Sequence, residues 1–269
     1  MAIKKRLMRG GASAVFSNFL ILSTQRSGST WLVDTLASHS QIKAYTELFL
    51  MNGDGCPDWS KYKDIVYWNT FRDSKKIQNK GASDISLLWE YLKLFYNRGE
   101  PNIGAYGFKL MYDQLKRYPA IVVYVIVNRV RIIHLYRENV VASVLSNVLR
   151  GARKKAHTTS NEELEQVYIP LDISSTKREI FWQCRKIELM KAVLRVLPVK
   201  VMSLSYESMV ADPNCLRDVF IFLEVKNLDI KSDLKRVGRR SIKEEISNVD
   251  DLLEALSGTQ FEPMLLRLY

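Results

Sequence analysis

Cysteine and histidine are scarce in this chain of 269 residues, which contains three of each. Cys56, Cys184 and Cys215 lie far apart and form neither a CxxC pair nor a Cys/His metal spacing. The sequence therefore predicts neither a disulfide scaffold nor a structural zinc site. Few, unpaired cysteines are typical of a reducing compartment.

Long apolar runs are missing as well. The longest, at 120–127, is far too short to span a bilayer. A basic N-terminus precedes a short apolar stretch at 14–22, but no small-residue cleavage site follows that stretch. We therefore expect a leader and a first strand rather than a signal peptide or a membrane span, and a cytoplasmic protein.

Acidic residues are outnumbered, since 40 lysines and arginines against 29 aspartates and glutamates give a net charge of +11. Such a balance fits an anionic ligand, a nucleic acid, an anionic membrane or simply a solvated basic surface. A nucleic-acid-binding module is one alternative. However, the basic residues are spread along the chain and accompany no RNP, zinc-finger or helix-turn-helix signature, so we expect no nucleic-acid partner.

Hydrophobic residues make up 47% of the chain, which is enough for a substantial core. Short apolar runs alternate with helical patterns, and this alternation predicts an α/β fold with a central parallel sheet flanked by helices. We see no repeat or linker and expect one P-loop-like domain over 1–269. Strands are predicted at 19–23, 106–110, 199–205 and at either 121–127 or 131–136. Helices are predicted at 30–38, 83–97, 140–150, 176–197, 213–223 and 250–256, with a helical turn at 112–117.

Of the two adjacent apolar runs, 131–136 is the better strand candidate, because a polar turn and a helix follow it directly. Ser83 is the expected N-cap of its helix. Two segments have no clear period, at 50–80 and at 151–168, and we expect them to be substrate-side loops. The aromatic residues of the first segment fit either an acceptor pocket or ordinary packing of a lid. These residues are Trp59, Tyr62, Tyr67, Trp68 and Phe71.

The loop at 24–30 lies between the first strand and the first helix, where backbone N–H groups and the helix dipole favour an anion. Gly28 allows close approach of the backbone, Ser29 and Thr30 add hydroxyl donors, and Arg26 adds a permanent charge. The GxxxxGK[ST] spacing of a Walker loop is absent, and no aspartate follows as an obvious magnesium partner. A metal is therefore not required.

The segment Thr-Gln-Arg-Ser-Gly-Ser-Thr-Trp-Leu at 24–32 resembles the donor-binding loop of sulfotransferases that use 3'-phosphoadenosine-5'-phosphosulfate (PAPS). The arginine at position 26 is similar to bacterial enzymes of the nodulation-factor and trehalose types, whereas cytosolic members carry a lysine there. Gly-Phe-Lys-Leu-Met at 107–111, Tyr206-Glu207 with Asp212-Pro213, and the segment 247–259 also resemble this family. The resemblance implies that the donor's 5' end is bound by Arg26, Ser27, Gly28, Ser29, Thr30 and Trp31.

The same resemblance implies a second phosphate site. The family holds the donor's 3'-phosphate with an arginine at a strand end and a serine in the next helix, and Arg137 and Ser146 match the bacterial pattern. Ser143 is an alternative to Ser146, because it lies one turn earlier on a similar side. His134, inside the strand, is expected to be a packed core residue.

Sulfuryl transfer needs an acceptor in line, a neutralised leaving phosphate and a base that takes the acceptor proton. The resemblance to the trehalose-type enzymes assigns Glu47 as that base, and the histidine of cytosolic members has no match here. Arg26 would neutralise the leaving group. Lys109 either adds positive charge near the sulfuryl group or forms only a surface ion pair.

The sequence thus predicts a metal-independent enzyme that moves the sulfuryl group of PAPS to a hydroxyl or amine of a small molecule. That acceptor is either a natural product such as an alkaloid or a glycan. The alternative is a P-loop kinase that phosphorylates a small molecule with ATP, although the lysine and acidic metal partner of such a kinase are not plainly present. The identity of the acceptor and the oligomeric state are left open.

Overall fold

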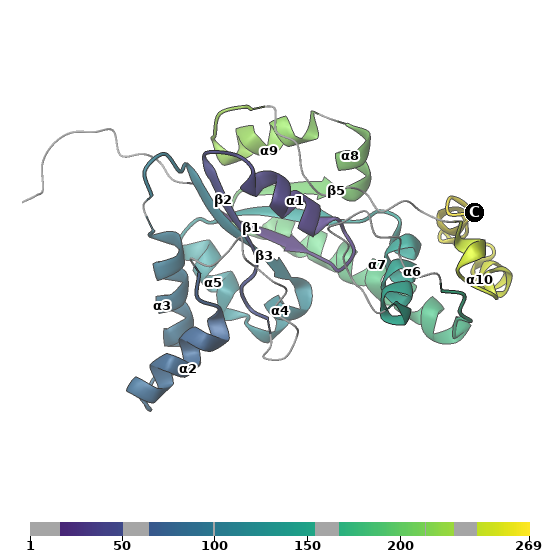
Figure 1. The fold of residues 1–269 in the computed structure, drawn as a ribbon, viewed down its shortest axis with the longest axis horizontal. Coiled ribbons are helices and arrows are strands. Elements are labelled where there is room, and N and C mark those ends of the chain that lie inside the picture. The colour runs from purple at the N-terminus through teal and green to yellow at the C-terminus, as the bar shows by residue number, and fades with distance from the viewer. Residues whose placement is uncertain (1–16, 51–64, 99, 154–166, 213, 229–240) are drawn as a thin grey trace, which may run out of the picture.

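The structure is a computed structural model, and it describes residues 17–50, 65–98, 100–153, 167–212, 214–228 and 241–269. Five parallel strands form one sheet in the order β2-β3-β1-β4-β5 (Figure 1). The strands are β1 (Ser17–Ser23), β2 (Ile42–Glu47), β3 (Ala105–Met111), β4 (Arg131–Tyr136) and β5 (Val201–Ser205). The predicted α/β class with a central parallel sheet is confirmed.

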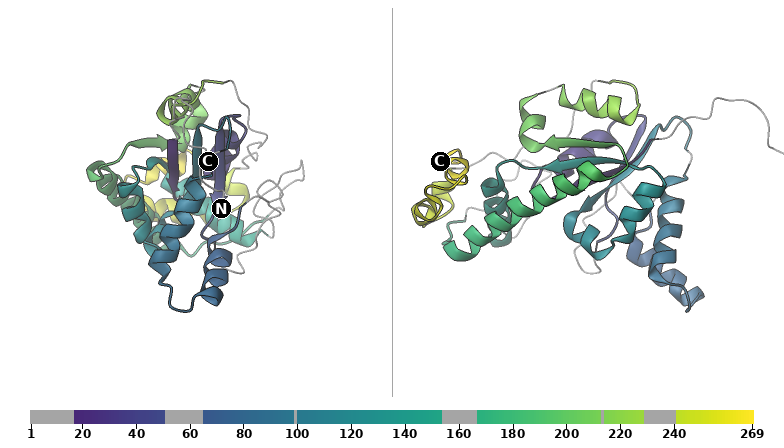
Figure 2. Two further views of the ribbon diagram at one scale, coloured as in Figure 1. Left: turned by 90° about the vertical axis from the view of Figure 1, so that its left-hand side faces the viewer. Right: turned by 180° about the vertical axis from the view of Figure 1, so that it is seen from behind.

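Helices cover both faces of the sheet, because the inner strands are apolar on both sides. One face packs against α1 (Ser29–Ala37), α8 (Tyr206–Ala211) and α9 (Cys215–Leu223). The other packs against α2 (Trp68–Gln78), α3 (Asp84–Tyr96), α4 (Tyr112–Arg117), α5 (Ala120–Val127) and the C-terminal part of α7 (Ile173–Val196). The two groups lie above and below the sheet in Figure 1, and Figure 2 shows α7 crossing the back of the molecule.

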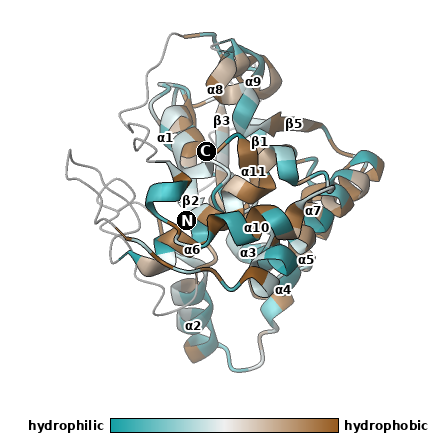
Figure 3. Cartoon of the chain, turned by 90° about the vertical axis from the view of Figure 1, so that its right-hand side faces the viewer, coloured by the Kyte–Doolittle hydropathy of each residue, from teal (hydrophilic) through white to brown (hydrophobic). Residues whose placement is uncertain are grey.

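A third cluster of buried side chains lies beyond the end of β4. It joins α6 (Val140–Ala152) and the N-terminal part of α7 to α10 (Val249–Leu256) and α11 (Glu262–Leu266). A short 3-10 turn, Ile242–Glu244, precedes α10. Figure 3 looks onto this side, with α10 and α11 in front of the sheet. None of the helices among the described residues is both long and apolar enough to cross a membrane.

The predicted strands at 19–23, 106–110, 131–136 and 199–205 all correspond to strands of the sheet, with ends that differ by up to two residues. The predicted helices correspond as well, with ends that differ by up to three residues, and Ser83 caps α3 by accepting a hydrogen bond from the Ser86 amide at 3.2 Å. The strand β2 was not predicted. It lies at the edge of the sheet, and its sequence alternates too weakly between apolar and polar residues to indicate a strand.

Of the two adjacent apolar runs, the preferred candidate 131–136 is the strand β4, and the alternative at 121–127 is the helix α5, which buries Ile121, Tyr124 and Val125 at helical spacing. A short apolar run does not by itself distinguish the two structures. One prediction is wrong in part. The segment 50–80 is not irregular throughout, because α2 occupies residues 68–78. Trp68 is fully buried against Phe49, so it packs in the core and does not line a pocket. Residues 51–64 and 154–166 lie outside the described part, and the single-domain organisation over 1–269 stays a prediction.

Candidate active site

Polar residues from four strand ends meet at the carboxyl edge of the sheet. The loop at 24–28 follows β1, Glu47 ends β2, Arg137 follows β4, and Glu207 lies just after β5. Parallel strands present their carboxyl ends at one edge, where α/β proteins bind their ligands. The loops after β1, β4 and β5 therefore share one edge of the sheet.

Gly28 has a backbone conformation that other residues rarely adopt, with φ of 79°. A Cβ atom at this position would lie 2.6 Å from Cδ2 of Tyr206, so a side chain has no room. Glycine is therefore required both by the turn and by the packing of the ring. The first bond of the α1 ladder runs from the Leu32 amide to the Gly28 carbonyl, at 3.1 Å. The amides of residues 29–31 precede that ladder, and amides at this position of a helix are suited to bind an anion.

Within the loop, the side chain of Ser27 stabilises the turn and that of Arg26 contacts the helix α6. The Ser27 hydroxyl is buried and donates to the Thr24 carbonyl at 2.8 Å, so it braces the turn. The Arg26 side chain is partly exposed, and its Nε donates to Ser146 Oγ at 2.9 Å. Burial lowers the pKa of the Arg26 guanidinium, and the positive charges of Arg150 and Arg153 lower it further. The loop therefore sits in a concentration of positive charge that an anion would stabilise.

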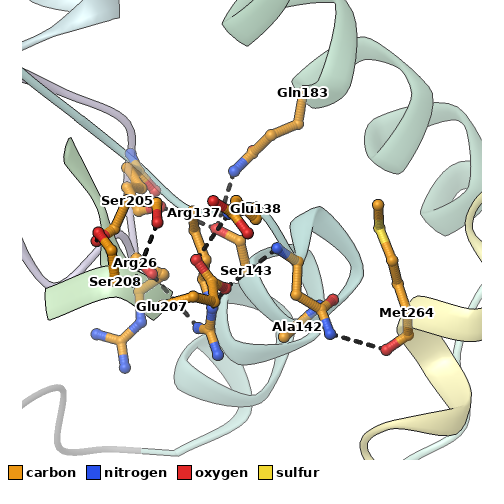
Figure 4. Close-up of polar contacts among 12 residues, drawn as sticks. Arg26, Arg137, Glu138, Ala142, Ser143, Gln183, Ser205, Glu207, Ser208 and Met264 are labelled. Atoms are coloured by element: carbon orange, nitrogen blue, oxygen red, sulfur yellow. Dashed lines mark hydrogen bonds and ion pairs between the residues drawn. The ribbon is translucent and has the colours of Figure 1, made fainter. Parts of the chain in front are cut away.

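Arg137 is buried, at 6% exposure, and lies directly beside the loop. Its terminal nitrogen donates to the Arg26 carbonyl at 3.4 Å (Figure 4). Its guanidinium lies over the Tyr206 ring, 4.9 Å from the ring centroid. Glu207 forms an ion pair with Arg137 Nε at 3.8 Å, which is too long for a hydrogen bond, and it accepts hydrogen bonds from the amides of Glu138 and Asn139. Arg137 Nε has no hydrogen-bond partner among the residues that the structure describes. A buried guanidinium with an unused donor is well suited to an oxyanion.

The two candidate serines of α6 have different surroundings. Ser143 is 1% exposed; its hydroxyl donates to the Gln25 carbonyl at 3.0 Å and accepts from Gln183 Nε2 at 2.9 Å (Figure 4). Ser146 is partly exposed and contacts Arg26. The structure thus brings Ser146 to the loop and uses Ser143 to join the loop to α6 and α7.

Glu47 is held between two donors from neighbouring elements. Its Oε1 lies 2.8 Å from Lys109 Nζ, and its Oε2 accepts a hydrogen bond from Gln114 Nε2 at 2.8 Å. Gln114 Oε1 in turn accepts from the Met111 amide at 3.0 Å. Lys109 is buried, at 6% exposure, so its ion pair is not on the surface. Sequence reasoning missed Gln114; its position three residues after the N-cap of α4 is the local pattern that indicates such a bond.

His134 is a packed core residue, as predicted. It is fully buried in β4, its ring lies beside those of Tyr112 and Tyr136, and its Nε2 shares a hydrogen bond with the Tyr112 hydroxyl. Burial, followed by the charge of Lys191, lowers the pKa of His134 to about 4. The imidazole is therefore neutral at physiological pH.

The sequence of the chain matches a known protein family. A model of the sulfotransferase family matches residues 18–227, a range that contains every site residue named above. A sulfotransferase from Alicyclobacillus acidocaldarius is 17% identical, with a TM-score of 0.47 and an alignment covering 94% of each chain. Sulfotransferase STF9 from Mycobacterium avium is 13% identical, with a TM-score of 0.41, covering 90% of this chain and 76% of that one. No curated protein sequence matches the chain.

Proposed function

The chain belongs to the sulfotransferase family, and from this premise we propose that it moves the sulfuryl group of PAPS to a hydroxyl or amine of a small-molecule acceptor. The observation that supports this donor is the pair of cationic sites at the ends of β1 and β4, which are neighbouring strands. Arg26 serves the first site, Arg137 the second, and the contact from Arg137 to the Arg26 carbonyl joins them. A donor with phosphates at both its 5' and its 3' positions needs two such sites, whereas ATP needs one.

The residues present fit this donor. Arg26 and the amides of residues 29–31 would hold its 5' end, and Arg137 with its unused Nε would hold the 3'-phosphate. Ser146 Oγ accepts from Arg26, so the hydroxyl hydrogen of Ser146 can be donated to a phosphate oxygen. We retain the cytoplasmic location, where PAPS would be available, as part of the proposal.

In the proposed reaction the acceptor oxygen or nitrogen forms a bond to sulfur while the bond from sulfur to the donor's 5'-phosphate oxygen breaks. Glu47 takes the acceptor proton. Arg26 and the loop amides neutralise the charge that develops on the departing phosphate. Lys109 keeps a second positive charge beside the Glu47 carboxylate.

The two contacts of Glu47 are compatible with a role as base. A carboxylate offers about four lone-pair sites, and Lys109 and Gln114 each use one, on different oxygens. The remaining sites can accept a hydrogen bond from the acceptor. Because both donors are buried, they also fix the orientation of the carboxylate before the acceptor binds.

Thermal unfolding with nucleotides tests the donor. We expect 3'-phosphoadenosine-5'-phosphate (PAP), the product, to raise Tm without magnesium, because ligand at 100 times its Kd stabilises a protein by about 2.7 kcal/mol. Arg137→Ala should lose this shift, whereas Arg178→Ala, at an exposed position of α7, should keep it. Stabilisation by ATP with magnesium but not by PAP would contradict the proposal and support a kinase.

The acceptor is best sought by mass spectrometry. PAPS-loaded enzyme would be incubated with separate panels of glycans and of hydroxylated or amine-bearing natural products. A product heavier by one sulfuryl group identifies the acceptor class. Transfer from ATP instead of PAPS would exclude the proposed reaction.

A further inference from the structure

The long helix α7 has two apolar sides, and the core accounts for only one of them. Its inner side buries Thr176, Ile180, Ile187 and Leu194. Its outer side carries Trp182, Leu189, Val193 and Val196, which are 54%, 67%, 42% and 80% exposed. These four follow one another at spacings of seven, four and three residues, so they form one stripe along the helix. Single exposed apolar residues are ordinary, but a continuous stripe indicates an interaction surface.

The apolar surface continues from α7 onto α5. Val122 of α5 lines a cavity of about 40 Å³ together with Val193 and Leu197, and every residue around this cavity is apolar. Elsewhere on α5, Val123 and Val127 are 52% and 62% exposed. Figure 2 shows α5 and α7 beside each other on the same side of the sheet. We call the exposed sides of these two helices the α5/α7 surface.

Positive charge predominates on the exposed part of α7. The exposed side of this helix carries five cations and two carboxylates, Glu179 and Glu188. The cations are Lys177, Arg178, Arg185, Lys186 and Arg195. None of the five forms an ion pair with another described residue, whereas Glu188 is neutralised by Lys191 at 2.9 Å. In Figure 3, hydrophobic and hydrophilic stretches alternate along α7.

We propose that the α5/α7 surface docks onto an anionic lipid membrane. A helix that lies in the plane of a bilayer combines an apolar stripe with lysine and arginine, which is the composition of the outer side of α7. Leu189, Val193 and Val196 would enter the acyl boundary and Trp182 the headgroup level. The unpaired cations would lie against lipid phosphates.

Charge also distinguishes a membrane from the other possible occupants. A symmetric pair of copies would bring the same side of α7 against itself, and five cations on each partner would repel one another. A nucleic acid would neutralise the cations but would leave the apolar stripe in water. An anionic bilayer satisfies both features at once. This proposal does not depend on the identity of the sulfuryl donor or acceptor.

Co-sedimentation of the full chain with lipid vesicles tests the proposal. We expect binding to phosphatidylcholine vesicles that contain phosphatidylglycerol, and little binding to phosphatidylcholine alone. In 1 M salt the binding should weaken strongly, because the Debye length falls to about 3 Å. The double variant Arg185→Glu/Lys186→Glu should lower the partition coefficient by roughly thirtyfold or more, since each cation near such a surface contributes about 1 kcal/mol.

Matched variants test whether membrane binding depends on the stripe of α7 or on exposed apolar residues in general. Leu189→Ser with Val196→Ser should abolish binding, whereas Ile221→Ser on α9 and Ile77→Ser on α2, which are 62% and 80% exposed, should leave it unchanged. All of these variants should keep their Tm and the shift caused by PAP, because none contacts the site. The proposal is overturned if anionic vesicles are not bound or if the stripe variant binds like the wild type. It is also overturned if light scattering shows a dimer that the stripe variant dissociates, or if oligonucleotides bind more tightly than vesicles.

Discussion

At the scale of single residues, Glu47 illustrates how the site is preorganised. The carboxylate ends an edge strand, where a side chain would ordinarily be free to rotate, yet Lys109 and Gln114 hold one oxygen each at 2.8 Å. Both partners are buried, so the geometry costs little additional side-chain entropy when a ligand arrives. The same arrangement makes each of the three residues sensitive to substitution.

Replacing Glu47 with glutamine removes the proposed base and keeps the shape of the side chain. Turnover should fall by roughly two to four orders of magnitude, because general base catalysis contributes that much. The Tm shift with PAP should persist, which shows that the donor site is intact. Unchanged turnover at saturating substrates would exclude the role. A loss of fold, seen by circular dichroism, would trace the effect to the unpaired Lys109 instead.

Gln114 is a positioning residue in this scheme. Gln114→Leu should lower kcat roughly 10- to 100-fold, because a misplaced reacting group costs about that much, while the KM for PAPS stays the same. A lowered Tm together with a raised KM for PAPS would instead indicate a purely structural contribution.

Gly28 and Gly151 form a matched pair for testing the donor loop. Gly28→Ala should destabilise the protein by about 1–3 kcal/mol and abolish the Tm shift with PAP, because φ is positive and the new Cβ meets Tyr206. Gly151→Ala, in α6 with no atom within 4 Å of its new Cβ, should stabilise by about 0.5–1 kcal/mol. Chemical denaturation gives both values. A benign Gly28→Ala would show that the turn tolerates a side chain.

At the scale of elements, Asn139 ties the helix behind the donor site to the C-terminal helices. Its side chain accepts from the Ala142 amide at 2.8 Å as the N-cap of α6 and donates to the Met264 carbonyl of α11 at 2.8 Å. Asn139→Ala should therefore lower the free energy of unfolding by about 1–2 kcal/mol. This is more than the loss expected for an N-cap whose side chain makes a single hydrogen bond. Asn147→Ala, at an exposed position of the same helix, should change stability little. Equal Tm values for the two variants would contradict this account.

Local patterns specify most elements of this fold, and the exceptions have physical reasons. The strands that were predicted are apolar and bounded by polar turns, and α3 begins at a serine cap. The helix α5 was ambiguous because nearly all its residues are apolar, so hydrophobic periodicity is invisible until the structure shows which of them are buried. The helix α2 was missed because its anchoring residue, Trp68, packs on partners far away in the sequence.

At the scale of the whole molecule, the buried His134 makes stability depend on pH. Its pKa of about 4 lies below the value of about 6.5 in an unfolded chain, so the unfolded state binds more protons between these values. The contribution of neutral His134 to the free energy of unfolding should be complete above pH 6.5, and it should fall by about 3 kcal/mol as the pH drops to 4. The neighbouring charges of Lys191 and Glu188 and the rings of Tyr112 and Tyr136 define this environment.

Denaturation curves at several pH values check this prediction. The carboxylates of the protein also titrate in acid. The informative quantity is therefore the difference in the free energy of unfolding between the wild type and His134→Gln. That difference should diminish progressively between pH 6.5 and 4. A difference that is independent of pH would show that folding does not lower the pKa of His134.

The α/β class and the positions of the glycine loop and of Arg137 at strand ends could be predicted from the chain, because each depends on neighbouring residues: a strand, a turn and a helix start. The contacts that complete the site could not. Lys109 and Gln114 reach Glu47 only because β2 pairs with β3, and Ser146 meets Arg26 only because β4 pairs with β1. Strand order and register depend on how the apolar faces pack over long separations, and local patterns do not encode that packing.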